Sequence, residues 1–331
     1  MTMRIVSLGG GHGLYATLTA MRGLSADVTA VVTVADDGGS SGRLRAELGV
    51  IPPGDLRMAV AALLGAPAAL DGLDDAQAQR HELWANALQH RFGGYGALAG
   101  HPVGNLLLSG LTELLGDPVA ALDEIVHALG IGGRVLPMSV VPLEIEADVS
   151  GLESDPRISR VIRGQVAVAT TPGKVRRVRL LPADPPACDP ALAAIAAADL
   201  ITLGPGSWFS SVIPHVLVPD QLTALQDSPA RKVLIVNLAP EPGETPGFSV
   251  ERHLHVLHAH ADTFAVDHVV VDAGSVPDGR EREHLERAAG MFGATLAVGD
   301  LAVPGRHVHD PAKVATVVNN LYQGKVFSED G

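Results

Sequence analysis

Residues 4–36 read RIVSLGGGHGLYATLTAMRGLSADVTAVVTVAD, and this stretch decides the fold. Its first part, 4–10, is a short run of β-type composition, and residues 13–24 carry apolar side chains at helical spacing. Residues 27–36 are nearly all apolar again, as expected of a strand that is buried on both faces. A strand, a glycine-rich turn, a helix and a second strand in this order predict the opening unit of a doubly wound parallel sheet.

The rest of the chain extends this α/β pattern with one change of texture. We predict helices over 54–65, 75–91, 103–116, 117–130 and 311–322. From about 134 to 181, polar and apolar residues alternate between Gly and Pro, which predicts a β-rich insertion or extension. We therefore predict one Rossmann-like α/β domain over 1–331 with a mainly parallel sheet. Its parts are a nucleotide-binding half (about 1–133), the β-rich segment (about 134–181) and a second α/β half (about 189–325).

The composition argues against several classes of partner. The formal net charge is −13 and aromatic residues make up only 3%, so nucleic acid is not an expected partner. Of the 331 residues, 47% are hydrophobic, yet no apolar run approaches the roughly 20 residues that span a bilayer. The first residues enter the strand and glycine pattern at once, so we expect no cleavable signal peptide. We expect a cytoplasmic protein with no membrane insertion; a homo-oligomer is compatible with this composition.

The loop after the first predicted strand is rich in glycine. Residues 9–16, GGGHGLYA, align as Gly-x-Gly-x-x-Ala, a form of the dinucleotide-binding fingerprint. Glycines let the backbone approach a phosphate, and the start of the following helix offers free N–H groups and a favourable dipole. The candidate phosphate contacts are Gly9, Gly10, Gly11, His12 and Gly13. A purely structural turn remains open from this loop alone.

The loop after the second predicted strand, DDGGSSGRLR at 36–45, is denser in polar groups. Asp36 stands where a ribose-binding acid sits in dinucleotide-binding proteins. Asp36 and Asp37 are candidates for a catalytic role, since either could hold a hard cation, and Asp37 is the candidate ligand for Mg²⁺. The expected phosphate donors are Gly38, Gly39, Ser40, Ser41 and Arg43, through N–H groups, hydroxyls and a guanidinium. The structural alternative is a capped short helix after a glycine turn.

Further candidates follow other predicted strands or begin helices. For the carboxylate of PPGDLR, at 52–57, a plain N-cap is as good an explanation as a role in binding. Binding and capping are likewise both open for the asparagine of GHPVGNLLL, at 100–108. The turn at 204–207 repeats the opening pattern in the other half of the sheet, as a ligand lying across the switch point would require. The candidates from these segments are Asp55, Arg57, Asn105, Gly204, Gly206, Ser207 and Asn237.

Taken together, these motifs resemble the YvcK family of gluconeogenesis factors, within the wider group of CofD-like proteins. The resemblance rests on GGGHGL, TVADDGGSSGRLR, PPGDLR, GHPVGNLLL, LGPGSWFSS and PGETPGFS, which occur in order over nearly the whole chain. It departs from the family at His12, where Thr is usual, at Met58, where Asn is usual, and in the loop after Asn237, which lacks a Thr and a Gln. These departures affect ligand preference more than fold.

The resemblance implies a cytoplasmic protein that binds a nucleotide sugar such as UDP-N-acetylglucosamine. Proteins of this family are linked to cell shape and cell-wall synthesis during growth on gluconeogenic carbon sources. The related transferase CofD implies an alternative: a Mg²⁺-dependent transfer of 2-phospho-L-lactate from a nucleoside-diphosphate donor to a deazaflavin. An NAD-dependent oxidoreductase is a third interpretation, which depends only on the glycine fingerprint and Asp36. The run at 36–43 favours the non-catalytic, regulatory interpretation.

Overall fold

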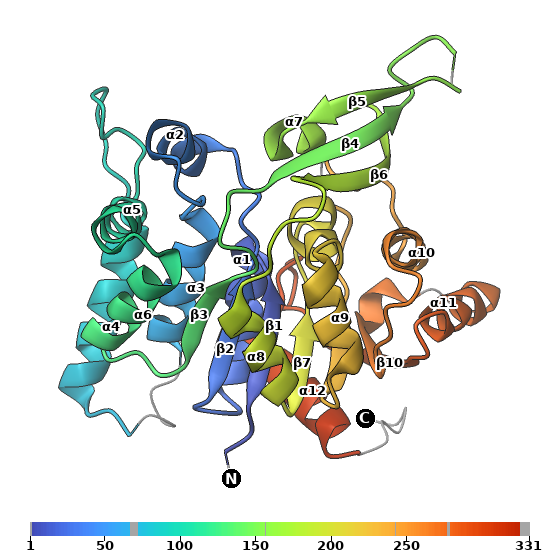
Figure 1. Ribbon diagram of the computed structural model, residues 1–331. Helices are drawn as coiled ribbons and strands as arrows, with labels where there is room; N and C mark the ends of the chain where they lie inside the picture. The colour runs from blue at the N-terminus through green and yellow to red at the C-terminus, as the bar shows by residue number, and fades with distance from the viewer. Residues whose placement is uncertain (1, 67–71, 156, 242, 277–278, 325–331) are drawn as a thin grey trace.

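The main body of the protein is a seven-stranded, fully parallel sheet in the order β10-β9-β8-β7-β1-β2-β3 (Figure 1). The computed structural model describes residues 2–66, 72–155, 157–241, 243–276 and 279–324. The strands are β1 (Ile5–Gly9), β2 (Val28–Val32), β3 (Arg134–Pro137), β7 (Leu200–Leu203), β8 (Arg231–Ile235), β9 (His268–Asp272) and β10 (Thr295–Gly299). The strand order reverses between β1 and β7, which makes this the switch point where open α/β sheets bind ligands.

Helices cover both faces of this sheet. In Figure 1, α8 and α9 lie in front of the strands and α1 and α12 lie behind them. On the rear face α1 packs against both α3 and α12, and α3 packs against α4. The longer helices are α1 (Gly11–Arg22), α2 (Gly39–Leu48), α3 (Gly54–Gly65), α4 (Asp75–Gln89), α5 (Val103–Leu115), α6 (Pro118–Ala128), α8 (Asp189–Ala197), α9 (Pro219–Asp227), α10 (Val250–His260), α11 (Arg280–Gly290) and α12 (Pro311–Tyr322).

The composition of the strands explains this layering. All five residues of β1 and all four of β7 are buried, as helices on both faces of a parallel sheet require. After β7 the chain does not enter a regular α-helix directly. It passes through a π-helical turn, η2 (Trp208–Val212), and a 3-10 turn, η3 (Ile213–Val216), whose residues are all buried. The aromatic residues of η2 thus fix the segment that follows the second glycine turn.

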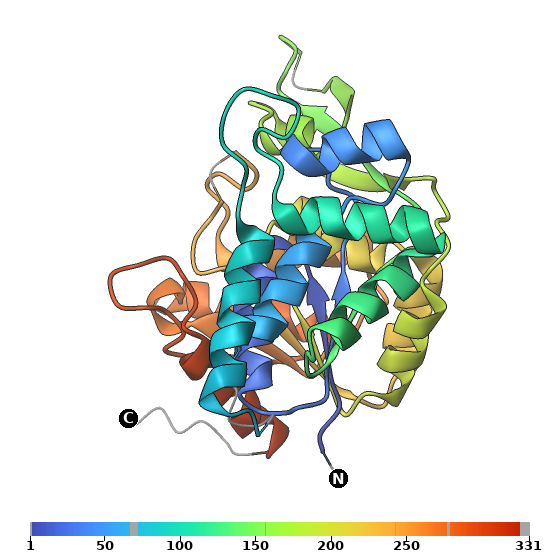
Figure 2. The same ribbon diagram turned by 90° about the vertical axis from the view of Figure 1, so that its left-hand side faces the viewer.

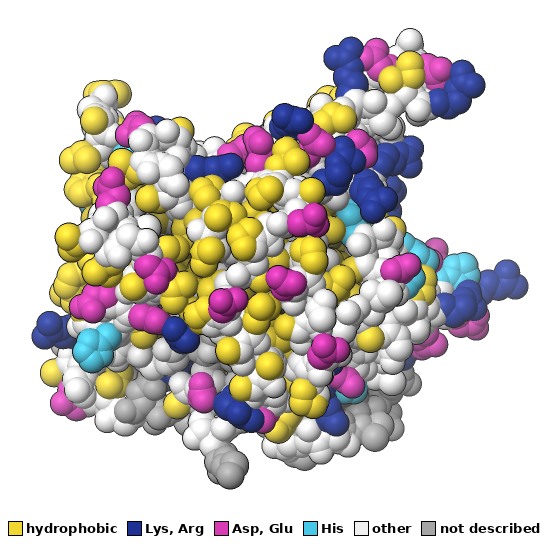
Figure 3. Space-filling view, viewed as in Figure 1, with side chains coloured by type: hydrophobic (Ala, Val, Ile, Leu, Met, Phe, Trp, Pro, Cys, Tyr) yellow, Lys and Arg dark blue, Asp and Glu magenta, His cyan; other side chains and the backbone are white. Residues whose placement is uncertain are grey.

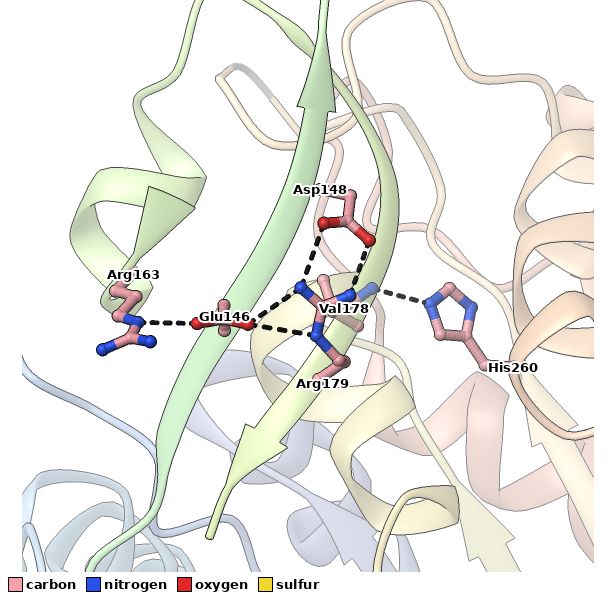
Figure 4. A network of polar contacts seen from close by, with 6 residues as sticks. All are labelled: Glu146, Asp148, Arg163, Val178, Arg179 and His260. Atoms are coloured by element: carbon pink, nitrogen blue, oxygen red, sulfur yellow. Dashed lines mark hydrogen bonds and ion pairs between the residues drawn. The ribbon is translucent and has the colours of Figure 1, made fainter. Parts of the chain in front are cut away.

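A smaller antiparallel sheet projects beyond the carboxyl ends of the main strands (Figure 1). Its order is β5-β4-β6, with β4 (Glu144–Ser150), β5 (Ser159–Arg163) and β6 (Lys174–Leu181), and the short helix α7 (Gln165–Ala169) lies between β5 and β6. Charged side chains alternate across one face of this sheet: Arg163 and Arg179 flank Glu146 at 2.6 and 2.8 Å, and Arg179 also contacts Asp148 (Figure 4). These guanidinium groups lower the pKa of Glu146.

One histidine ties this small sheet to the main body. His260 at the end of α10 accepts a hydrogen bond from the Val178 backbone N–H at Nε2, at 2.9 Å (Figure 4). Its Nδ1 lies 2.7 Å from the Val256 carbonyl and is the donor, so the ring is neutral. Burial lowers the pKa of His260, which favours the same neutral form.

The predicted fold class is confirmed, with one change at a boundary. The β-rich segment predicted from about 134 to 181 divides in two, because β3 pairs in parallel with β2 and belongs to the main sheet. The antiparallel unit begins only at Glu144. The predicted helix over 54–65 is α3 and that over 311–322 is α12, with the same bounds.

Candidate functional site

A polar cavity of about 230 Å³ opens at the carboxyl ends of β1, β2 and β7. It therefore lies at the switch point of the sheet. Its wall comes from both glycine turns, both neighbouring loops and the projecting sheet. The lining residues are Gly10, Gly11, His12, Gly13, Thr33, Asp36, Asp55, Gln165, Gly206, Ser207, Ser210, Ser211 and Glu241.

The two glycine turns lie in direct contact across the cavity floor. A Cβ atom on Gly13 would lie 2.1 Å from the Pro205 carbonyl oxygen, so a side chain there would force the turns apart. The turn after β7 is held from below by Asn237, whose side-chain amide makes two hydrogen bonds of 2.9 Å with the N–H and carbonyl of Gly206. Both hydrogen-bonding ends of Asn237 are thereby engaged with backbone. Its place in the structure is to position the second turn.

Asp55 is buried against the first glycine turn. Helix α3 begins at Gly54 with Pro53 as its N-cap, so Asp55 lies within the first turn and makes no capping hydrogen bond. Its carboxyl group instead accepts a hydrogen bond from the Gly11 N–H, at the start of α1. Burial, and secondarily the charge of Asp36, raises the pKa of Asp55 to about 7. A carboxyl group that titrates near neutrality thus occupies the end of the helix where an anion would be expected to bind.

The two neighbouring aspartates of the second loop face different ways. Asp36 lines the cavity and accepts hydrogen bonds from Gly38 N–H, at 2.9 Å, and from the Ser41 hydroxyl; its burial raises its pKa. Asp37 faces the projecting sheet, where its Oδ1 accepts from the Val166 N–H at 2.9 Å. A Cβ atom on Gly164 would lie 2.3 Å from Asp37 Oδ2. The Asp37 carboxylate therefore clamps the start of α7, which carries Gln165 in the cavity wall.

Ser40 is turned away from the cavity toward α5. Its hydroxyl lies 2.7 Å from His101 Nδ1 and accepts from the Asn105 side-chain amide at 3.0 Å. All three side chains are buried, and the amide oxygen of Asn105 has no partner among the described residues. Arg43 is exposed and donates to the Ala99 carbonyl at 2.8 Å. This group forms a separate polar contact between α2 and α5.

Arg57 is the most enclosed cation near the site. Its side chain is buried between α3 and Gly104, and its Nε donates to the Gly54 carbonyl at 3.4 Å. Burial lowers its pKa to about 10, and Asp55 and Asp36 act in the opposite direction. Arg57 thus offsets part of the negative charge of the two cavity carboxylates from behind the wall.

Glu241 completes the wall, with Glu244 buried behind it; Glu244 falls in the family motif PGETPGFS, but neither glutamate is among the candidate site residues predicted from the sequence. Ser207 donates to Glu241 at 2.9 Å, and Glu244 accepts from the Phe209 and Ser210 N–H groups at the start of η2, at 3.0 and 3.1 Å. Burial and the adjacent Glu241 carboxyl raise the pKa of Glu244 to about 8. These residues lie in a loop rich in Pro and Gly, where no strand or helix pattern points to a site.

A second hollow of about 440 Å³ adjoins the cavity. The two share His12, Gly13, Gly206 and Glu241, so they form one elongated cleft across the glycine turns. The added wall is mainly apolar and comes from 237–240 and 307–309. A polar end, a glycine-lined middle and an apolar end succeed one another along this cleft.

The structure thus divides the predicted site residues into two sets. Those that line the cleft are Gly10, Gly11, His12, Gly13, Asp36, Asp55, Gly206, Ser207 and Asn237. Those outside its lining are Gly9, Asp37, Gly38, Gly39, Ser40, Ser41, Arg43, Arg57, Asn105 and Gly204. Within the described ranges, no group of three or more His, Cys, Asp or Glu side chains is arranged to hold a metal ion.

Fold and cleft together define a Rossmann-like α/β protein with a glycine-lined cleft at its switch point. The family model "2-phospho-L-lactate transferase CofD" matches residues 5–295. A Mycobacterium tuberculosis relative is 63% identical over 321 residues, which are 97% of this chain and 91% of that protein. The Bacillus subtilis protein named gluconeogenesis factor is 34% identical over 86% of this chain and 84% of its own length.

A solved structure agrees with these sequence comparisons. The crystal structure of a UPF0052 family member from Bacillus halodurans is similar with a TM-score of 0.81 and 31% identity, over 96% of this chain and 99% of the other. The chain belongs to the gluconeogenesis factor (YvcK, UPF0052) family of CofD-like proteins. In the part of the chain that the structure describes, no helix has both the length and the apolar character needed to cross a membrane.

Proposed function

We propose that the protein binds a nucleotide sugar, such as UDP-N-acetylglucosamine, in the cleft across the two glycine turns. The observation that carries this proposal is the succession of a polar pocket, a glycine-lined middle and an apolar pocket, joined at four shared residues. In the first turn of α1 the Gly11 N–H is engaged by Asp55, so the proposal places the diphosphate beside the backbone of His12 and Gly13, which line the middle section. The cavity carboxylates are suited to the hydroxyl groups of a sugar.

The family supports a proposal for the biological setting. The Bacillus subtilis relative is named gluconeogenesis factor. We infer that the present protein acts in the cytoplasm as a regulator whose ligand occupancy depends on the concentration of the nucleotide sugar. Such a regulator would connect growth on gluconeogenic carbon sources to cell-wall synthesis and cell shape.

A metal-dependent transferase is the second candidate, because the cavity offers carboxylates, Asp36 among them, that could serve singly as a ligand for Mg²⁺. Mg²⁺ commonly takes one or two protein carboxylates and completes its shell with water and substrate phosphates. Asp36 is the better placed ligand, because it lines the cavity, whereas Asp37 faces α7. Bound Mg²⁺ would neutralise a diphosphate and stabilise the leaving group.

Calorimetric titration with UDP-N-acetylglucosamine, GDP and NAD, each with and without Mg²⁺, separates these functions. Saturable UDP-sugar binding without turnover supports the regulator. Preference for GDP with strict dependence on Mg²⁺ supports the transferase, and a deazaflavin acceptor assay then follows. Saturable binding of NAD alone would contradict both.

A pair of variants tests the location of the ligand. His12→Ala removes an exposed side chain that lines both pockets, and we expect roughly a tenfold loss of UDP-sugar affinity. Arg43→Ala is the matched control from the same set of sequence motifs, because Arg43 contacts Ala99 instead of the cleft. An unchanged affinity in His12→Ala together with a large loss in Arg43→Ala would place the ligand elsewhere.

A further inference from the structure

Helix α5 presents leucines to solvent on its outer side, in addition to those it buries. The residues on its outer side include Leu107 and Leu114, which are 37% and 78% exposed. Its buried side includes Leu108, which is 4% exposed, together with Asn105 and Ser109, which are 1% and 2% exposed. In an ordinary surface helix the apolar side chains gather on the buried side and the outer side is polar. An outward apolar face of this kind marks an interaction surface.

The outer residues follow the spacing of a helix–helix seam. Val103, Leu107, Gly110 and Leu114 are separated by four, three and four positions, which is the heptad spacing of paired helices. We call these four residues the α5 stripe. A Cβ atom on Gly110 would meet nothing within 4 Å, so the middle of the stripe is open and flat. Another helix can therefore approach closely there.

The surroundings of the α5 stripe extend this uncharged surface. No Asp, Glu, Lys or Arg occurs from residue 92 to residue 112. The loop just before α5 carries Tyr95, which is fully exposed, and Leu98, which is 53% exposed. Figure 2 shows α5 uncovered on the outer surface, and Figure 3 shows hydrophobic side chains along the left margin of the molecule, over α5 and this loop.

Charges of opposite sign stand at the two ends of the helix. At its amino-terminal end, Arg91 pairs through its backbone with Pro102, and Arg43 contacts Ala99. Glu113 is exposed at the carboxyl-terminal end. Among the described residues, none of these three side chains has an ion-pair partner of opposite charge.

We propose that the α5 stripe is the interface between two copies of this chain, with the two α5 helices antiparallel about a twofold axis. The seam is then self-complementary: Val103 faces the partner's Leu114, and Leu107 faces the partner's Gly110. The same arrangement brings Arg91 toward the partner's Glu113, twice. Since each chain carries a formal net charge of −13, two copies repel least where both surfaces are uncharged.

Sedimentation equilibrium of the full chain over a range of concentrations tests this proposal. We expect a dimer for the wild type. The double variant Leu107→Glu/Leu114→Glu should raise the dimer dissociation constant on the order of 100-fold or more. The matched control is Ile158→Glu, which makes the same chemical change at a residue that is 50% exposed and lies in the projecting sheet. A thermal melt by circular dichroism shows that each variant is folded.

Charge exchange tests the antiparallel geometry. Glu113→Arg and Arg91→Glu should each weaken the dimer, and the double variant should recover most of the loss. Recovery confirms the pairing, and equal weakening in all three variants would refute it. A wild-type monomer at all concentrations overturns the proposal. Membrane binding is the alternative use of this surface. The proposal is also overturned if the wild type is monomeric and sediments with phosphatidylglycerol–phosphatidylethanolamine vesicles, and Leu107→Glu/Leu114→Glu abolishes this vesicle binding.

Discussion

Replacement of Asp55 by Asn should change how the stability of the protein depends on pH. The Asp55 carboxyl is buried against Gly11, and its pKa rises from the ordinary 3.8 to about 7. The native protein therefore keeps a proton that the unfolded chain releases. Stability is lost as the pH rises between these two values and is then constant. The rise in pKa corresponds to about 4 kcal/mol of wild-type stability lost across this interval.

Urea unfolding at several values from about pH 4 to about pH 8 measures this effect. The amide introduced by Asp55→Asn cannot ionise, and its oxygen can still accept from the Gly11 N–H. The difference in free energy of unfolding, Asp55→Asn minus wild type, should therefore increase with pH, by up to about 4 kcal/mol. Asp74→Asn is the control, since Asp74 caps α4 far from the cleft and Asn caps equally well. A difference between Asp55→Asn and wild type that does not vary with pH would refute the reasoning.

Three further outcomes are expected. Gly13→Ala should lower the free energy of unfolding by roughly 1–3 kcal/mol, because the two glycine turns must separate. Gly290→Ala is the control and should not lower it, because an added Cβ there meets nothing within 4 Å. Glu244→Gln should raise Tm at alkaline pH but not near pH 5. Burial and the neighbouring carboxyl raise the pKa of Glu244 to about 8, and the wild type therefore loses stability as the pH rises toward that value. Asp37→Ala should speed amide exchange in residues 164–169, whereas Asp37→Asn, which keeps an acceptor for the helix, should not; equal exchange in both would contradict the clamp.

The sequence was sufficient for the parts of the structure that depend on local periodicity. Buried strands flanked by glycine turns are clear at residues 4–10 and 200–207, and both turns meet at the switch point as predicted. The family was equally accessible, because its motifs are short and ordered along the chain. These features need no knowledge of how distant segments pack.

The parts that depended on tertiary contacts could not be predicted in the same way. Nothing in the sequence around Asp36 and Asp37 indicates that Asp36 lines the cavity and Asp37 holds α7. The hydrogen-bond donor to Asp37, Val166, lies 129 residues further along the chain. Asn237 was predicted as a ligand contact and does line the cleft, but its two hydrogen bonds with Gly206 depend on a distant segment and could not be foreseen. Glu241 had no local pattern to mark it. Likewise, the periodicity of α5 shows that it is a helix but not which of its faces is covered.

The measurement that tests the central proposal most directly is a crystal structure of the protein with UDP-N-acetylglucosamine. We predict that the diphosphate lies against the first turn of α1 at Gly11–Gly13, with the rest of the ligand spread between Ser207 and the hollow at 237–240. Ligand density that lies against α10 and α11 and makes no contact with Gly11–Gly13, or no density at saturating concentration, would contradict the proposal.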